Sequence, residues 1–125
     1  MIEGVHHIAI LCSDRQRALR FYVDALGFTL ERAVPRPERG DEIVFLRGYG
    51  TTLELFVAPD HPPRQTQPEA YGLRHLAFRV PSVENMIAHL QSLGFEPEPI
   101  RQDSVDGMNM TFVKDPDGLP IELHE

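Results

Sequence analysis

The sequence has few of the features that mark secreted, membrane or nucleic-acid-binding proteins. Its only cysteine, Cys12, has no second thiol in the chain with which to form a disulfide. No apolar run approaches the roughly 18 residues of a membrane span, and the first residues lack the basic and apolar regions of a secretory signal. A net charge of −7 and a pI near 5.3 do not suit a nucleic-acid or anionic membrane surface. From these absences we expect a cytoplasmic protein that binds neither nucleic acid nor membranes.

Two further absences exclude certain kinds of binding and catalytic sites. The sequence contains no Gly-rich phosphate loop and no dinucleotide-binding fingerprint. Nothing near Cys12 supplies the base or the positive setting that a nucleophilic thiol needs, so we interpret it as a small buried residue. With 125 residues, 42% hydrophobic and 25% charged, the chain has the size and composition of one globular domain.

What the sequence does contain is an internal repeat of histidine and glutamate. His7 precedes Glu54 by 47 positions, and His75 precedes Glu122 by the same 47 positions. The neighbouring residues match as well, with His-Ile-Ala against His-Leu-Ala and Leu-Glu-Leu against Ile-Glu-Leu. Equivalent histidines and glutamates in a duplicated unit predict a metal site on a pseudo-two-fold axis.

Each half of the chain is expected to form a strand, a helix and three further strands. The first helix follows Ser13, which is expected to be its N-cap in a capping box with Gln16, and ends at Gly27. The second helix is expected between Ser82 and Gly94. Expected strands are 5–12, 28–34, 42–48 and 52–58 in the first half, and 73–80, 95–101, 108–114 and 119–124 in the second.

These elements predict an α+β fold in which two βαβββ modules form curved mixed sheets around a metal-containing concavity. We expect one domain over residues 1–125, with module one at about 5–58, a proline-rich linker at about 59–72, and module two at about 73–125. Strand side chains alternate between faces. One face of each sheet is aliphatic and suits packing against a helix, and the other carries a His or a Glu near the strand centre. Five side chains are expected either to line the pocket or to lie in the core: Phe45, Phe56, Met108, Met110 and Phe112.

The candidate metal ligands are His7, Glu54, His75 and Glu122. Imidazole nitrogen together with carboxylate oxygen suits Zn, Ni, Co, Mn or Fe. Four such ligands, with no thiolate, leave a position for water or substrate, which is typical of a catalytic site. The alternative for any one of them is an ordinary strand residue.

The other histidines are less attractive as ligands. Strand parity groups His6 with Ile8, and the repeat aligns His7 with His75, so His6 is expected at the strand end or behind the ligand. His61, His89 and His124 are expected at the surface, although His124 shares a strand face with Glu122.

The order of the predicted strands and helices, together with several short motifs, resembles the vicinal oxygen chelate superfamily, which includes glyoxalase I, bleomycin resistance proteins and dioxygenases. The resemblance rests on Arg20-Phe21-Tyr22, on Ala25-Leu26-Gly27-Phe28, on the ending at 115–123 and on the His-Glu-His-Glu set. It is strongest to small bacterial glyoxalase I-like members. It implies a divalent-metal-dependent lyase or isomerase, one metal per site, and a small α-oxo or α-hydroxy carbonyl substrate that reacts through a metal-chelated enediolate-type intermediate. It also implies a homodimer, and Glu122 or Glu54 as the catalytic base.

One departure from that pattern leaves the substrate open. Glutathione-dependent members of this size carry an Arg and an Asn where this chain has Leu11 and Ala58. Four cations could hold another substrate, namely Arg47, Arg64, Arg74 and Arg79. The alternatives are a methylmalonyl-CoA-type epimerase, which usually has Gln where Glu54 stands, and a non-catalytic protein that sequesters a drug or metabolite.

Overall fold

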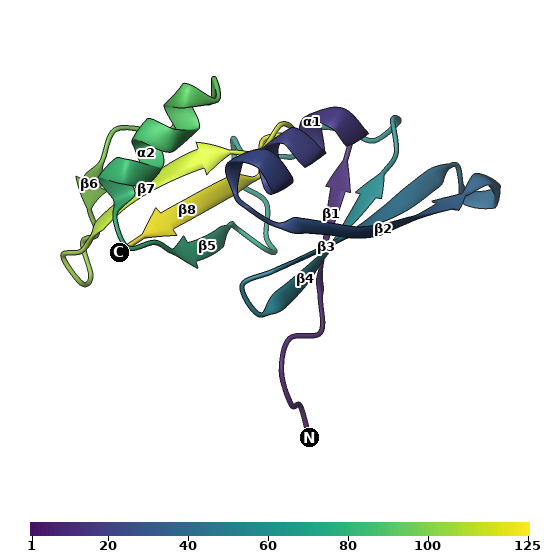
Figure 1. The fold of residues 1–125 in the computed structure, drawn as a ribbon, viewed down its shortest axis with the longest axis horizontal. Helices are drawn as coiled ribbons and strands as arrows, with labels where there is room; N and C mark the ends of the chain where they lie inside the picture. The colour runs from purple at the N-terminus through teal and green to yellow at the C-terminus, as the bar shows by residue number, and fades with distance from the viewer. The chain divides into compact units, whose positions relative to one another are not determined.

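The computed structural model describes all residues from Met1 to Glu125. The chain divides into two compact units, Met1–Pro62 and Pro63–Glu125. Each unit contains one four-stranded sheet and its own helical segment (Figure 1).

The first unit begins with β1 (Ile8–Cys12), α1 (Arg15–Leu19) and the π-helical turn η1 (Arg20–Ala25). The remaining elements are β2 (Thr29–Arg36), the short 3-10 turn η2 (Pro37–Arg39), β3 (Asp41–Gly48) and β4 (Thr51–Val57). The strand order is β1-β4-β3-β2. β1 runs parallel to β4, and the other pairs are antiparallel. The last strand of the unit is therefore hydrogen-bonded to the first.

The second unit has the same order of elements. It contains β5 (Leu76–Arg79), α2 (Val83–Ser92), β6 (Arg101–Gln102), β7 (Asn109–Lys114) and β8 (Pro120–His124), with strand order β5-β8-β7-β6. β5 is parallel to β8, and the other pairs are antiparallel. The α+β fold of two βαβββ modules with mixed sheets is confirmed.

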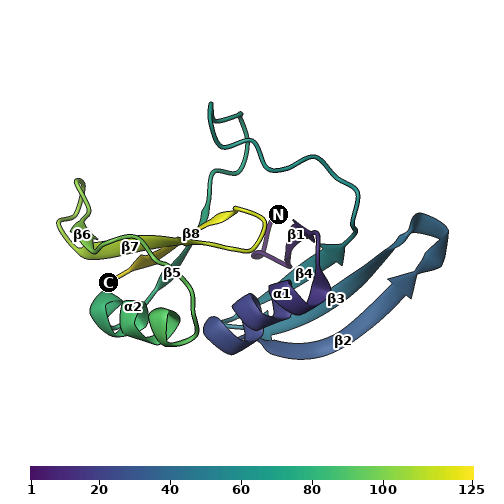
Figure 2. The same ribbon diagram turned by 90° about the horizontal axis from the view of Figure 1, so that it is seen from above.

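Strand alternation correctly predicts the buried face of each sheet. Leu53 and Leu55 on β4 are fully buried, as are Ile121 and Leu123 on β8, and Cys12 is buried on β1. Each unit's helix lies against one face of its sheet, as the two views in Figures 1 and 2 agree. The glutamates between these aliphatic residues must then point to the opposite face, because successive side chains alternate.

The start of the first helix differs from its prediction. Asp14, not Ser13, is the N-cap, and its carboxylate accepts a 2.8 Å hydrogen bond from the Arg17 backbone N–H. Ser82 caps α2 as predicted, accepting from the Asn85 N–H at 3.1 Å. Adjacent Ser and Asp are both good N-caps, so the sequence pattern alone identified the wrong one.

Three predicted strands are shorter than expected by three residues or more. β1 and β5 begin at Ile8 and Leu76, so His7 and His75 lie immediately before these strands instead of near their centres. The strand expected at 95–101 is reduced to Arg101–Gln102. Pro97 and Pro99 have no N–H for a ladder, and only the intervening Glu98 N–H bonds across, to the carbonyl of Phe112 at 2.8 Å.

The helices of the structure are also informative about membranes. None of them is both long and apolar enough to span a bilayer.

Candidate metal centre

The register of β1 against β4 places one imidazole beside one carboxylate in the first unit. Ala9 lies opposite Glu54 in this parallel pair, so the residue beside the carboxylate on β1 has a small side chain. His7 lies two residues before Ala9 and reaches this carboxylate. Its Nδ1 lies 3.2 Å from Oε2 of Glu54, and the glutamate side chain is only 14% exposed.

The second unit repeats this arrangement. Ala77 lies opposite Glu122 in the parallel pair of β5 and β8. Nε2 of His75 lies 3.3 Å from Oε1 of Glu122, whose side chain is 13% exposed. The structure thus brings the predicted residues together as His7 with Glu54 and His75 with Glu122.

A phenylalanine flanks each glutamate on its other side. Phe45 of β3 lies opposite Glu54, and Phe112 of β7 lies opposite Glu122. Both phenylalanines are partly buried, and the His75 ring meets Phe112 edge-on at a centroid distance of 5.1 Å. Each carboxylate therefore lies between a small alanine and an aromatic ring, which limits the directions in which it can turn.

The other residues expected at the pocket or in the core differ in burial. Phe56 is partly buried and shares the face of Glu54, while Met110 is only 5% exposed and belongs to the core. Met108 lies before β7 and is 45% exposed, so it is not a core residue.

The spacing of the two donors in each pair fits a shared metal ion. Nitrogen and oxygen ligands lie about 2.0–2.2 Å from zinc. Two such ligands at angles between a right angle and the tetrahedral angle are then separated by about 2.8–3.6 Å. The observed separations of 3.2 and 3.3 Å fall in this interval. Neutral imidazole and carboxylate are also the donor types that divalent transition metals accept.

His6 lies closer to the first pair than strand parity indicates. Its Nδ1 is 2.8 Å from Nδ1 of His7, and donor atoms of His6, His7 and Glu54 all lie within 4.8 Å of one another. Parity fails here because the strand begins only at Ile8, so the backbone of His6 and His7 is not held in the alternation of β1.

The structure also adds residues around Glu122 that the sequence did not indicate. Donor atoms of Asp103, Glu122 and His124 lie within 4.8 Å of one another. Nε2 of His124 is 3.1 Å from a carboxylate oxygen of Asp106, so His124 is no ordinary surface residue. The only sequence signal was its position two residues after Glu122, on the same strand face.

The hydrogen bonds of this cluster shift two of its pKa values. The backbone carbonyl of Glu125 and the nearby acidic side chains, Asp106 first among them, raise the pKa of His124. Backbone N–H groups of Val105 and Asp106 donate to the Asp103 carboxylate and lower its pKa. Both shifts favour the charged forms, which attract each other.

Known proteins are similar to this chain in both sequence and fold. Residues 4–123 match the model of the Glyoxalase/Bleomycin resistance protein/Dioxygenase superfamily. The uncharacterized protein YwkD of Bacillus subtilis is 48% identical over 126 residues, covering 100% of this chain and 98% of the relative. The crystal structure of a glyoxalase family protein from Enterococcus faecalis is 47% identical, with a TM-score of 0.93 and 98% of each chain covered.

More distant relatives include enzymes of two kinds. The human mitochondrial methylmalonyl-CoA epimerase is 30% identical over 95 residues, which cover 70% of this chain and 52% of the relative. Glyoxylase I 4 of Arabidopsis thaliana is 25% identical over 126 residues, covering 98% of this chain and 70% of the relative.

Proposed function

Because the chain belongs to the glyoxalase/bleomycin resistance protein/dioxygenase superfamily, we propose that it is a divalent-metal-dependent enzyme of the glyoxalase I type. It would act as a lyase or isomerase on a small α-oxo or α-hydroxy carbonyl compound. The observation that carries this proposal is the repeated pair: an imidazole and a carboxylate at 3.2 Å in one unit and at 3.3 Å in the other, each beside an alanine and a phenylalanine.

The proposed ligands are His7, Glu54, His75 and Glu122, and the metal is Zn, Ni, Co, Mn or Fe. A bound divalent ion supplies Lewis-acid stabilisation of negative charge on adjacent substrate oxygens. Ligands of mixed nitrogen and oxygen type, with no thiolate, are those of a site that keeps a position open for substrate.

The two glutamates are the proposed bases. A carboxylate oxygen of Glu54 or Glu122 removes the proton from the carbon beside the substrate carbonyl, and the electron pair left on that carbon moves onto the carbonyl oxygen. In an α-hydroxy carbonyl compound the hydroxyl proton then passes to the former carbonyl oxygen, and the carbon that carried the hydroxyl becomes the new carbonyl. The same carboxyl group returns the first proton to the neighbouring carbon, so the isomerisation gains and loses no atoms. Ala9 and Ala77 lie opposite these glutamates on one side, and Phe45 and Phe112 lie opposite them on the other. The glutamate side chains are only 14% and 13% exposed, so few water molecules can reach them.

A coenzyme A thioester epimerase is the second candidate. The 30% identity to the human methylmalonyl-CoA epimerase favours it, and epimerisation needs the same removal of a proton beside a carbonyl. Glu54 in place of the usual glutamine counts against it. The family resemblance also supports a homodimer, which sedimentation of the purified protein would test.

Proton exchange tests the proposal directly. Metal-loaded protein is incubated in D2O with methylglyoxal and each of several thiols, and separately with methylmalonyl-CoA, and deuterium at the reacting carbon is followed by NMR. We expect exchange and product with an α-oxo substrate, and loss of both in Glu122→Gln or Glu54→Gln. The matched control is Glu38→Gln, in the exposed turn η2. Full activity in both active-site variants would contradict the proposal, and exchange only in methylmalonyl-CoA would favour the epimerase.

A further inference from the structure

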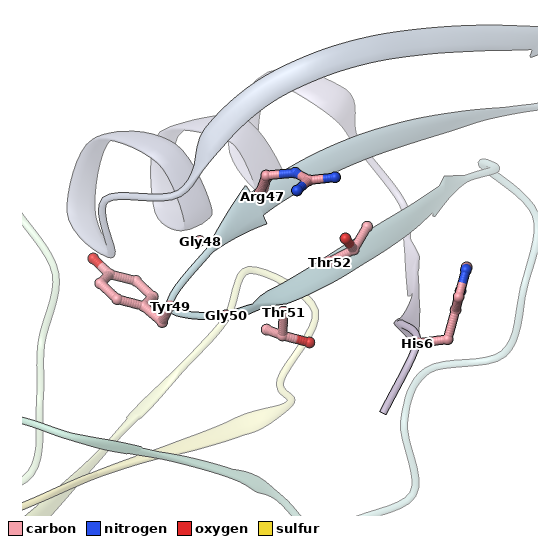
Figure 3. Close-up of a pocket in the computed structure, with 7 residues that line it drawn as sticks. All are labelled: His6, Arg47, Gly48, Tyr49, Gly50, Thr51 and Thr52. Carbon is pink, nitrogen blue, oxygen red and sulfur yellow. The ribbon is translucent and has the colours of Figure 1, made fainter. Parts of the chain in front are cut away.

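A small pocket opens beside the His7–Glu54 pair, at the end of the hairpin that joins β3 to β4. Its volume is about 360 Å³, and its lining contains no aliphatic side chain: His6, Arg47, Gly48, Tyr49, Gly50, Thr51 and Thr52 (Figure 3). His6 connects the pocket to the proposed centre, because its Nδ1 lies 2.8 Å from Nδ1 of His7. A ligand bound between Glu54 and this pocket would meet polar groups at the pocket end.

The register of the hairpin places Arg47 on the same face as Glu54. Glu54 pairs with Phe45 and Thr52 pairs with Arg47, so the two pairs are separated by two residues on each strand. In Figure 3 the side chains of Arg47 and Thr52 project from the same side of the hairpin, while Thr51 projects from the other. Diagonal neighbours of this kind have Cβ atoms about 7–8 Å apart, which is within the reach of an arginine side chain.

At a β-bulge in β2, a glutamate contacts the Arg47 guanidinium through its Nε only. The register of β2 against β3 shifts between Leu30 and Arg32, which leaves Glu31 as the extra residue. Bulges redirect side chains, and here the Glu31 carboxylate lies 3.0 Å from Nε of Arg47. The two terminal nitrogens of the guanidinium remain without a partner, and the Arg47 side chain is 69% exposed.

Other arginines of the same unit are already engaged. Arg36 donates through Nε and Nη2 to both carboxylate oxygens of Asp41, at 2.8 and 2.6 Å. Arg15 donates to both oxygens of Glu42, and the guanidinium of Arg32 lies 4.4 Å from the centre of the Phe45 ring. Arg47 therefore differs from them in having a free fork of two donors beside a pocket.

From this arrangement we propose that Arg47 binds an anionic group of the substrate, so that the substrate is a small carboxylate or phosphate as well as an α-oxo or α-hydroxy compound. The inference rests on the proposed function, because it places the substrate's paired oxygens at the metal. The planar guanidinium fork matches the oxygens of a carboxylate or a phosphate in bidentate geometry. The hydroxyl of Thr52, the register partner of Arg47, supplies a further hydrogen-bond donor.

Three bidentate chelators that share one hydroxamate group test this inference. Acetohydroxamate has a neutral methyl group, malonic monohydroxamate adds a carboxylate, and phosphonoacetohydroxamate adds a phosphonate. Binding to the zinc-loaded protein is measured by titration calorimetry. We expect at least one of the two charged compounds to bind at least tenfold more tightly than acetohydroxamate, and the better of the two identifies the anion class. Equal affinity for all three would overturn the inference without any variant.

Arg47→Ala should remove the preference and leave acetohydroxamate and zinc binding within about twofold, since neither needs the guanidinium. The matched control is Arg39→Ala, which removes the same charge at the opposite end of β3 and should keep the tenfold preference. A preference that survives in Arg47→Ala would overturn the assignment of Arg47. Binding of acetohydroxamate without preference would overturn only the anion site, whereas failure of the protein to bind zinc or any hydroxamate would overturn the proposed function with it.

Discussion

Removing one imidazole at a time distinguishes metal ligands from neighbouring histidines. His7→Ala and His75→Ala each delete a nitrogen that lies 3.2 or 3.3 Å from a glutamate oxygen. His6→Ala removes a ring that contacts His7, and His89→Ala removes an exposed ring on α2. These four variants differ in contact with the proposed metal but are alike in chemistry.

The size of the effect follows from the number of ligands. Zinc binds small four-ligand peptides with about 10–16 kcal/mol at neutral pH, which is about 2.5–4 kcal/mol per donor. Loss of one donor should therefore weaken zinc binding about 60- to 700-fold. We expect this range for His7→Ala and His75→Ala, about tenfold for His6→Ala because it acts through His7, and no change for His89→Ala.

Competition with a chromophoric chelator at fixed pH measures these affinities, and circular dichroism verifies that each variant is folded. The reasoning is refuted if folded His75→Ala loses less than tenfold in zinc affinity. It is equally refuted if His89→Ala loses as much as His75→Ala.

Four further predictions concern stability and the surroundings of the ligands. Asp14→Ala should destabilise the protein by about 1 kcal/mol in urea unfolding, because the Asp14 carboxylate accepts the cap hydrogen bond from the Arg17 N–H. An unchanged free energy of unfolding would contradict this. Leu55→Ala should lower the free energy of unfolding by about 2–5 kcal/mol, because Leu55 is fully buried. Leu30 is 42% exposed, so Leu30→Ala should lower it by well under half as much. Equal losses would contradict the assigned core. The Arg36 guanidinium lowers the pKa of Asp41, so this pair stabilises the folded protein above the unfolded pKa near 4, and the stabilisation is lost as the pH falls through the lower folded pKa. The free energy of unfolding of the wild type should therefore fall more steeply below about pH 4 than that of Asp41→Asn. Parallel curves of unfolding free energy against pH would exclude this role. Arg64 donates hydrogen bonds to the carbonyls of Leu73 and Arg74, directly before His75. Arg64→Ala should therefore weaken zinc binding about tenfold, and the control Arg39→Ala should not weaken it. Unchanged zinc affinity in Arg64→Ala would show that this contact does not position His75.

The repeat could be predicted because it lies in the order of residue types. The interval from His7 to Glu54 recurs from His75 to Glu122, and strand alternation correctly identifies the buried Leu53, Leu55, Ile121 and Leu123. Both follow from local rules of side-chain direction. The register between two strands depends on residues far apart in the sequence. The two phenylalanines that lie opposite the glutamates could therefore be identified only from the paired strands of the structure.

The errors arose where two local signals compete or where pairing ends. Ser13 and Asp14 are both good caps, and the backbone geometry selects Asp14. Strand parity does not hold for His6 because β1 begins only at Ile8. The run 95–101 forms only a two-residue strand because Pro97 and Pro99 cannot donate hydrogen bonds. The partners of Arg47 and His124 depend on a bulge and on a loop far along the chain, which no sequence pattern indicated.

The metal content of the protein purified from cells tests the central claim most directly. Elemental analysis of the wild-type chain, followed by zinc titration of chelator-treated protein, gives the number of divalent ions bound per chain. If the four proposed ligands bind one ion together, the protein should hold about one divalent ion per chain. A wild-type protein that retains no divalent metal and takes up none at micromolar zinc would contradict the account.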